Sequence, residues 1–569
     1  MIGQEDFIEL LMQRYQHVKE ARTRHESTWT KLSQHALPFL PVDFSSENNE
    51  FGISSAKETE EIMDPTFSSC CTKYSSIMET LLTPHDRKWH TLKPVDNALY
   101  DEITANNGHV YDTNHKDLAI WLETINDTLF RIRYSPDSGF KSALSDVYLD
   151  LCVYGNACLS VFERRDASDK VIGFKYSCIP LRELYWEENS ERKVNTVFRR
   201  FSLKPWQIAS CKDWNISELS ESTQRAIAEK KNDPITFLHV VMPKNEGSGD
   251  IVASHFEFEG VFFEEKEKHI IRKGGYRKNP YIAVRFLLAQ MDAYGYSHAL
   301  QALPSSMFIN KIKKNDIIQR EFFSNPVWFA KSHIGQSIFE RYPMRPGEII
   351  PGGIDSDGSS AITAMKIGEP NAYGDLVERE KQNIKNVFNI DAFLSEDTKT
   401  HRTTTEINER IREKNRLITP IMSRLQEDLL SPLIAREIDI GKVYKLFEKK
   451  QAESPLINYL KDLVDKIEYH SYVSMMQKAE EIAGITRSSE ILAGMYAQTQ
   501  DRRYLIQKPY ETSVKIMNAN NVSSTCYLSS DEAKTEHENQ TKDDDLMKNA
   551  EIARKLAPYA ENAQKGGGM

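Results

Sequence analysis

The chain has 569 residues, of which 40% are hydrophobic and 10% aromatic, and its formal net charge is -10 at pH 7. This length is too great for a single core, so we expect several domains or one elongated subunit built of several parts. The negative charge argues against a protein that coats nucleic acid electrostatically, although not against one that surrounds DNA without gripping it.

Amphipathic helices dominate the chain before Gly155. The first is predicted over about residues 3–35, and the second begins at Asp64, an N-cap with Pro65 in its first turn. Two more are predicted at 112–134 and 138–154. Short apolar or alternating segments then predict strands at 158–163, 174–179, 194–201, 236–242 and 255–263. Gly274 and Gly275 predict a hairpin turn rather than a phosphate-binding loop.

A helical pattern returns from Tyr294 to Arg320 and again from Tyr373 to Phe388. The block between them is rich in glycine and proline and predicts only short β segments. Its apolar run of Val327, Trp328 and Phe329 suits an exposed strand that a neighbouring subunit completes, and a small local core is the alternative. A polar loop follows at 391–402.

One long helix is predicted over residues 403–440. Thr403 and Glu406 form a capping box, and apolar residues recur at helical spacing through Ile407, Ile411, Ile418, Met422, Leu425, Leu429 and Leu433. At about 1.5 Å per residue this element would span roughly 55 Å. Pro420 and Pro432 fall inside it and are predicted to kink it.

The C-terminal part predicts further helices around 455–467, 472–485 and 491–496. The polar segment 526–569, which includes three consecutive aspartates at 543–545, predicts a mostly disordered tail.

Sequence signals for enzymatic chemistry are missing. The seven cysteines form no C-x-x-C pair, and there is no P-loop and no G-x-S-x-G motif. No pattern of histidines, cysteines and carboxylates predicts a metal site. No run of eighteen apolar residues occurs, so no membrane-spanning segment and no membrane partner are expected. We therefore predict a non-enzymatic protein that needs no cofactor.

Several motifs share an order along the chain. They are the N-terminal helix with Arg22 and Trp29, the segments 63–66 (MDPT), 81–89 (LLTPHDRKW), 135–140 (SPDSGF) and 151–157 (LCVYGNA), then Asn279-Pro280-Tyr281 with Arg285 and Tyr294-Gly295, and finally 401–407 (HRTTTEI). In this order the chain resembles the head-to-tail connector, or portal, proteins of T7-like short-tailed bacteriophages. The resemblance covers residues 1 to about 500.

The resemblance implies an α+β, predominantly helical and elongated portal subunit with a wing, a stem, a clip and a crown, assembled into a ring. It divides the chain into a wing at 1–293, a descending stem helix at 294–322, a clip at 323–372, an ascending stem helix at 373–390, a tunnel loop at 391–402, the long kinked helix at 403–440, a crown at 441–525 and the polar tail at 526–569.

The resemblance also implies a role in the podovirus virion. Portal proteins form a ring, usually of twelve subunits, at one capsid vertex, where the head meets the tail, after assembly in the host cytoplasm. Double-stranded DNA passes through the ring during packaging and ejection. The implied partners are terminase, the major capsid and scaffolding proteins, and tail adaptor or tail tube proteins. The alternative function is a soluble oligomeric scaffold or adaptor without DNA contact.

Basic residues in the predicted stem and tunnel loop are candidates for lining the channel. They are Lys311, Lys313 and Lys314 on the first stem helix, Lys381 and Lys385 on the second, and Lys399, His401 and Arg402 in the loop. The alternative for each is an ordinary solvated position. We expect the loop to line the narrowest part of the channel, as a valve.

Overall fold

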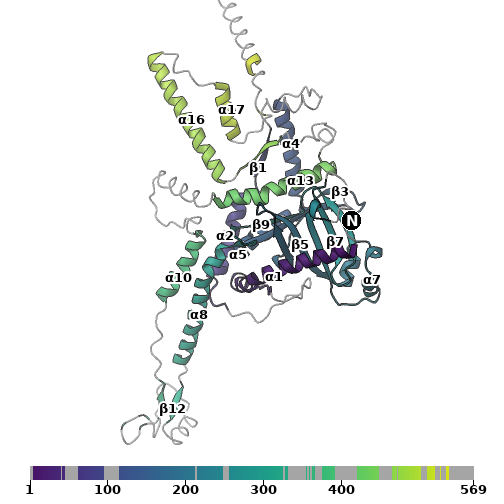
Figure 1. The fold of residues 1–569 in the computed structure, drawn as a ribbon. Coiled ribbons are helices and arrows are strands. Elements are labelled where there is room, and N and C mark those ends of the chain that lie inside the picture. The colour runs from purple at the N-terminus through teal and green to yellow at the C-terminus, as the bar shows by residue number, and fades with distance from the viewer. Residues whose placement is uncertain are drawn as a thin grey trace, which may run out of the picture. The chain divides into compact units, whose positions relative to one another are not determined.

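The computed structural model describes residues 4–39, 41–44, 62–94, 115–211, 214–247, 256–324, 327–330, 354, 358, 360, 362–365, 374–390, 420–447, 464–470, 472–500, 509–519, 526 and 533–536. The chain forms an α+β fold (Figure 1). It divides into two compact units, the first made of Met1–Thr80, Pro136–Arg164 and Phe174–Asp439 and the second of the remaining segments. No helix among the described residues is long and apolar enough to cross a membrane.

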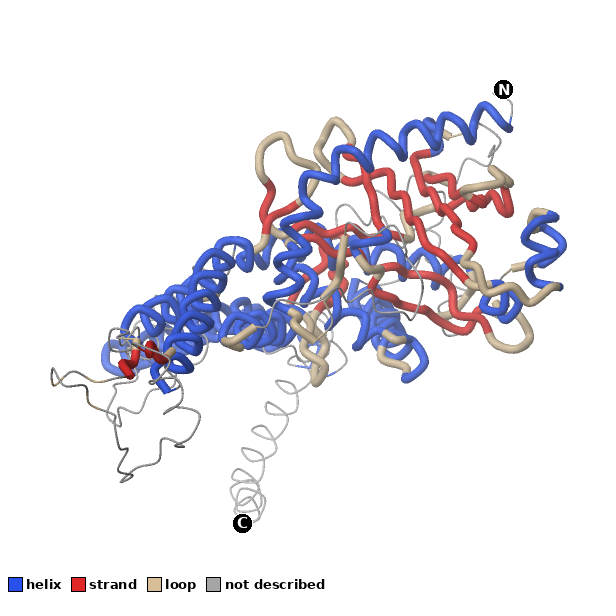
Figure 2. The backbone as a smooth tube through the Cα atoms, turned by 90° about the horizontal axis from the view of Figure 1, so that it is seen from below, coloured by secondary structure: helices blue, strands red, loops and turns tan. Residues whose placement is uncertain are grey.

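An antiparallel five-stranded sheet organises the first unit. Its strands lie in the order β4 (Leu184–Glu188), β5 (Val194–Leu203), β6 (Ile235–Pro243), β7 (Phe258–Glu264) and β8 (Ile270–Tyr276). The helix α1 (Gln4–Ala36) lies along one face of this sheet (Figure 2). Its residues Phe7, Leu11 and Tyr15 are buried there against alternate residues of the strands, because a strand turns every second side chain to the same face.

The opposite face of the five-stranded sheet carries the short helices α6 (Pro205–Ser210) and α7 (Glu221–Ala228), which cover Phe201 and Phe237. Glu264 of β7 holds the N-terminal end of α7 against the sheet. Its carboxylate accepts a hydrogen bond from the Ser220 N–H at 2.9 Å and one from the Thr223 hydroxyl at 2.8 Å. A negative charge at a helix N-terminus is favourable. With α1 on one face and α6 and α7 on the other, the sheet has a helix layer on each side.

A smaller sheet follows α5 (Phe140–Tyr154), in the order β3 (Val171–Cys178), β2 (Asn156–Arg165) and β9 (Tyr281–Arg285). Between α5 and β2, Gly155 adopts a φ of 73°. A Cβ there would lie 2.4 Å from the carbonyl carbon of Tyr296 on the hairpin β10 (Leu287–Leu288) and β11 (Gly295–Tyr296). The position after α5 thus needs glycine both for its positive φ and for the close approach of the hairpin backbone.

The second unit holds α4 (His115–Arg133) and the strand pair β1 (His90–Pro94) and β14 (Val464–Tyr469). Arg133 of α4 is buried, with its guanidinium over the Trp89 ring and 3.0 Å from His90 Nε2. Burial and the positive charge of Arg133 hold the pKa of His90 well below its ordinary value, so this histidine stays neutral. The helices α16 (Tyr472–Thr499) and α17 (Pro509–Ala519) pack against each other.

Most predicted helices are confirmed within the described residues, among them α1, α2 (Thr66–Leu82), α4 and α5. Four predictions are wrong. The helix predicted from Tyr294 begins only at His298, because Gly295 and Tyr296 pair with Leu288 and Leu287 as β11. Residues 464–467, placed in a helix, belong to β14, and the separate helices at 472–485 and 491–496 are one helix, α16. Gly274 and Gly275 lie inside β8, opposite Gly260 and Glu259, instead of in a turn. The predicted tail lies almost wholly outside the described residues.

Candidate assembly site on the paired helices

The buried residues of the helix α8 (His298–Ser324) all lie in its first half. The Ser297 hydroxyl caps it by accepting the Leu300 N–H at 3.1 Å. Every buried residue of α8 precedes Lys311: Ala299, Ala302, Leu303, Ser306, Ile309 and Asn310. The second half therefore extends beyond the core to which the first half is fixed.

The helix α10 (Gly374–Val387) packs beside α8 (Figure 1). The Ser305 hydroxyl of α8 donates to Glu380 Oε2 of α10 at 2.7 Å. Just after α10, the buried Phe388 meets the rings of Phe67 and Tyr74 on α2, with centroids 6.2 and 5.7 Å away. Like α8, α10 is fixed to the first unit at one end.

The carboxylate of Asp64, at the start of α2, joins the two helices. Its Oδ1 accepts the Thr66 N–H at 2.8 Å, as the N-cap prediction requires. Its Oδ2 lies 2.5 Å from Lys313 Nζ on α8 and 3.7 Å from Lys381 Nζ on α10. Burial alone would raise the pKa of this carboxyl, but the hydrogen bonds from Lys313 and Thr66 outweigh it, and the pKa of Asp64 lies below its ordinary value.

These contacts divide the predicted channel residues. Lys313 and Lys381 hold a carboxylate that is only 7% exposed, so each already has a counter-charge within the chain. Lys311 and Lys314 are exposed on α8, and Lys385 is half-buried on α10. Lys399, His401 and Arg402 lie outside the described residues. We give Lys313 and Lys381 a bracing role and keep the channel proposal for Lys314, Lys385, Lys399, His401 and Arg402.

The exposed side of α8 is unusually apolar. Pro304, Phe308, Lys311, Asn315, Ile318 and Phe322 follow one another at alternating steps of four and three residues, and all are exposed. This spacing puts them on one face of the helix, as in the seam of a coiled coil. We call these six residues the α8 seam. It lies away from the face that the buried residues Ala302, Ser306 and Ile309 occupy.

Exposed apolar residues also occur on the two-stranded sheet that follows α8 in the chain. There β12 (Trp328–Ala330) pairs antiparallel with β13 (Ile362–Ala364), with Trp328 opposite Ala364. Val327, Trp328 and Phe329 are all exposed, as is Met365. In the isolated chain these side chains form no buried local core, so the alternative of a small core loses support.

The second half of the predicted long helix is helical from Pro420 to Val443, and residues 403–419 lie outside the described part. Residues Gln426–Leu430 form a π-helical turn, and α13 (Ser431–Val443) follows. Pro432, the second residue of α13, lacks an N–H. The π-helical turn and this proline together give a local cause for a kink at this position. The predicted apolar stripe is buried at Met422, Leu425, Leu429 and Leu433.

Two buried charges tie α13 to the three-stranded sheet. Glu437 accepts the Tyr176 hydroxyl of β3 at 2.5 Å, and Arg436 donates to Glu163 of β2 at 2.9 Å. The long helix predicted over residues 403–440 is therefore fixed to the first unit through its C-terminal half.

Among the described residues, no group of three or more histidines, cysteines and carboxylates is placed to hold a metal ion. Cys70, Cys71, Cys152 and Cys158 are buried free thiols, and Cys211 and Cys526 are exposed.

Comparison with known proteins decides the family. The profile described as "Bacteriophage head to tail connecting protein" matches residues 9–503. The chain belongs to this family of connecting proteins. It is similar to the "Portal protein" of Salmonella phage epsilon15, with 22% identity over 86% of this chain and 83% of the relative. It is also similar to the "Probable portal protein" of Bordetella phage BPP-1, with 22% identity over 75% of this chain and 73% of that protein.

The sequence did not reveal two features of this connecting protein. The bridge from Asp64 to Lys313 and Lys381 joins residues from three separate segments, so no local pattern predicts it. The α8 seam was predicted only as part of a helix, although its alternating spacing of exposed apolar residues is visible in the sequence. The signal that could have found it is the presence of two apolar faces on one helix where packing in a monomer needs one.

Proposed function

We propose that this chain is a phage portal protein whose copies form a closed ring, of twelve subunits, at one capsid vertex. Double-stranded DNA would pass through the ring during packaging and ejection. The ring would dock terminase, capsid and scaffolding proteins and tail adaptor or tail tube proteins at the head–tail junction, after assembly in the host cytoplasm. Membership of the connecting-protein family and the names of the two relatives support this function, and the chain itself would act without catalysis.

The exposed apolar residues of the α8 seam and of β12 are the observation that most strongly supports assembly into a ring. Large contiguous apolar surface is uncommon on a soluble monomer and marks sites of association. In a ring each copy would bury this surface against the next one. We propose residues 1–293 as the wing, α8 and α10 as the stem, 323–372 as the clip, 391–402 as the tunnel loop, 403–440 as the kinked helix, 441–525 as the crown and 526–569 as a polar tail.

A conduit for DNA must not bind phosphate tightly, because each neutralised phosphate adds to the binding free energy and would slow the moving duplex. A chain with a net charge of -10 meets this need when only a few basic residues face the channel. Lys314, Lys385, Lys399, His401 and Arg402 are the proposed ones. Lys311 was also predicted to line the channel, but it lies in the α8 seam, so we assign it to the contact between copies instead.

Mass photometry and negative-stain microscopy of the purified full chain test the proposal together. A portal gives closed rings with a central channel. The alternative, a scaffold or adaptor without DNA contact, gives oligomers without a channel. A chain that stays monomeric at micromolar concentration would contradict both functions.

Trp328→Ala is expected to leave the circular dichroism spectrum unchanged and to lower the yield of rings. The reason is that Trp328 is exposed in a two-stranded sheet, which gains little stability alone and would be completed by the neighbouring copy. Ring yield by mass photometry is the measurement. A normal yield would show that β12 has no role between subunits.

The double variant Lys399→Ala with Arg402→Ala is expected to assemble into rings but to package or retain DNA differently from the parent. Removing two charges from the proposed tunnel loop leaves the stem contacts intact while changing the element expected to line the narrowest part of the channel. Packaged DNA per particle, measured in a complementation assay, checks this. A ring structure in which this loop lies on the outer rim would contradict its proposed role as a valve in the channel.

A further inference from the structure

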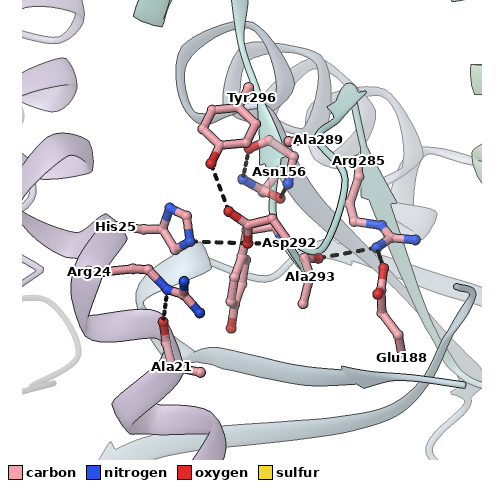
Figure 3. Close-up of polar contacts among 12 residues, drawn as sticks. Ala21, Arg24, His25, Asn156, Glu188, Arg285, Ala289, Asp292, Ala293 and Tyr296 are labelled. Carbon is pink, nitrogen blue, oxygen red and sulfur yellow. Dashed lines mark hydrogen bonds and ion pairs between the residues drawn. The ribbon is translucent and has the colours of Figure 1, made fainter.

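The tip of the β10–β11 hairpin, residues 289–293, is held by side chains from several elements (Figure 3). Asp292 lies 3.2 Å from His25 Nε2 of α1 and accepts the Tyr296 hydroxyl at 2.7 Å. On its other side, the Ala293 carbonyl accepts the Trp186 indole N–H at 3.0 Å and a guanidinium N–H of Arg285 at 3.2 Å. This bracing makes the tip a rigid part of the first unit.

Met291 stands at the centre of this braced tip and is 97% exposed. Its φ of 63° lies in the left-handed region, which glycine or asparagine adopts at lower cost than methionine. Neither burial nor backbone preference therefore explains a methionine here. The braced backbone of the tip loses little conformational entropy when a partner covers it, and the adaptable thioether side chain of a methionine can pack against an apolar partner surface.

Two exposed arginines flank the tip. Arg24 precedes His25 on α1 (Figure 3), and Arg192 donates to the Ala289 carbonyl at 2.7 Å while remaining exposed. Lys193 is exposed next to Arg192 but lies 4.0 Å from the exposed carboxylate of Glu191, so among the described residues here the two arginines carry the unpaired positive charge. The matching surface on a partner would be acidic, with an apolar residue to meet Met291.

The chain itself carries such a surface at the start of α1. Glu5, Asp6 and Glu9 are exposed there, and Leu10 is an exposed apolar residue among them. At 100° per residue these four positions share the outer side of the helix, opposite Phe7, Leu11 and Tyr15, which face the sheet. Leu10 lies fifteen residues before His25, about 22 Å along the helix at 1.5 Å per residue.

We propose that the Met291 tip of one copy docks on the acidic N-terminal face of α1 in a second copy. The two surfaces are different patches of the same chain, so the contact is head-to-tail, and such a contact repeated around a closing rotation generates a ring. This inference rests on the proposed function, because it names a second contact between the subunits of the proposed ring, separate from the α8 seam.

Disulfide trapping tests the contact in the full chain. Leu10→Cys and Met291→Cys are combined in a background with Cys211→Ser and Cys526→Ser, which removes the exposed native thiols. Added diamide accepts the two electrons and two protons that a thiol pair gives up as the disulfide forms. We expect a ladder of covalent multimers that dithiothreitol reverses. A mixture of the two single-cysteine proteins should give dimers and nothing larger.

The matched control pairs Leu10→Cys with Ile172→Cys, because Ile172 is also exposed but lies on β3. This pair should stay uncrosslinked. Met291→Glu, which puts a negative charge opposite the acidic face, should weaken assembly at low salt at least tenfold, and Met291→Leu should not.

Rings by mass photometry without the expected ladder would overturn this contact and leave the proposed function standing. Absence of any oligomer in the parent chain would overturn both. Equal crosslinking in the control pair would also overturn it, since random collision would then explain the ladder.

Discussion

Asp64→Asn is expected to loosen both α8 and α10 at once, lowering their local stability by about 2 kcal/mol. Removing one partner of a fully buried ion pair costs about 3–5 kcal/mol. Here the two lysines keep roughly a quarter to a third of their side chains exposed, so water compensates part of the loss. Asparagine keeps the hydrogen bond to the Thr66 N–H, so α2 should begin normally. Amide hydrogen exchange in α8 and α10 measures the change.

Glu378→Gln is the matched control for Asp64→Asn. Glu378 also pairs with Lys381, at 3.7 Å, but its side chain is 69% exposed. An exposed ion pair contributes about 0–1 kcal/mol, so exchange in this variant should stay close to that of the parent. Equal effects of the two substitutions would show that the burial of Asp64 does not matter and would contradict the bracing role.

The same contact predicts a pH dependence. The pKa of Asp64 is lowered in the folded chain, so the stability that it contributes is present above its unfolded pKa of about 3.9 and is lost as the pH falls through the lower folded value. The difference between the parent and Asp64→Asn should therefore be constant from neutral pH to about pH 5 and shrink below pH 4. A difference that grows on acidification would contradict the assignment.

The elements that could be predicted from the sequence are those with a local cause. The helix at Asp64 is one, since an N-cap and a proline in the first turn fix its start whatever surrounds it. β14 was missed because its stability comes from β1, and the backbone hydrogen bond from His470 to Trp89 joins positions that are far apart in the chain. A segment such as Val464-Asp465-Lys466-Ile467 has no strong preference of its own, and the tertiary partner decides its conformation.

The features of the candidate assembly site also differ in whether the sequence could predict them. The exposed apolar run at Val327, Trp328 and Phe329 could be identified from its contrast with the polar residues around it. The role of Lys313 could not, because a lysine on a helix looks alike in sequence whether it faces solvent, DNA or a buried carboxylate. Only the position of Asp64 between α8 and α10 distinguishes these cases. The sequence likewise predicted the helix that carries Ile318 but not that a second apolar face is left uncovered.

Ile318→Glu is expected to abolish ring formation while the chain stays folded. Ile318 lies in the middle of the α8 seam, 42% exposed in the single chain, so glutamate there costs the monomer little. In the ring the same position would be covered by the next copy, and an unpaired carboxylate would be buried at every subunit contact. A cost of about 3 kcal/mol at each contact weakens it roughly 100-fold, and a closed ring needs every contact. Mass photometry should show monomers or small oligomers.

Ile172→Glu is the matched control, because Ile172 has the same exposed fraction of 42% but lies on β3. It should form rings like the parent. If Ile172→Glu prevents rings as well, added negative charge alone is enough to disturb assembly of a chain that already carries a net charge of -10, and Ile318 has no special place. Ile318→Leu, which keeps the apolar character, should assemble normally; rings from Ile318→Glu would show that the α8 seam faces solvent in the assembled particle.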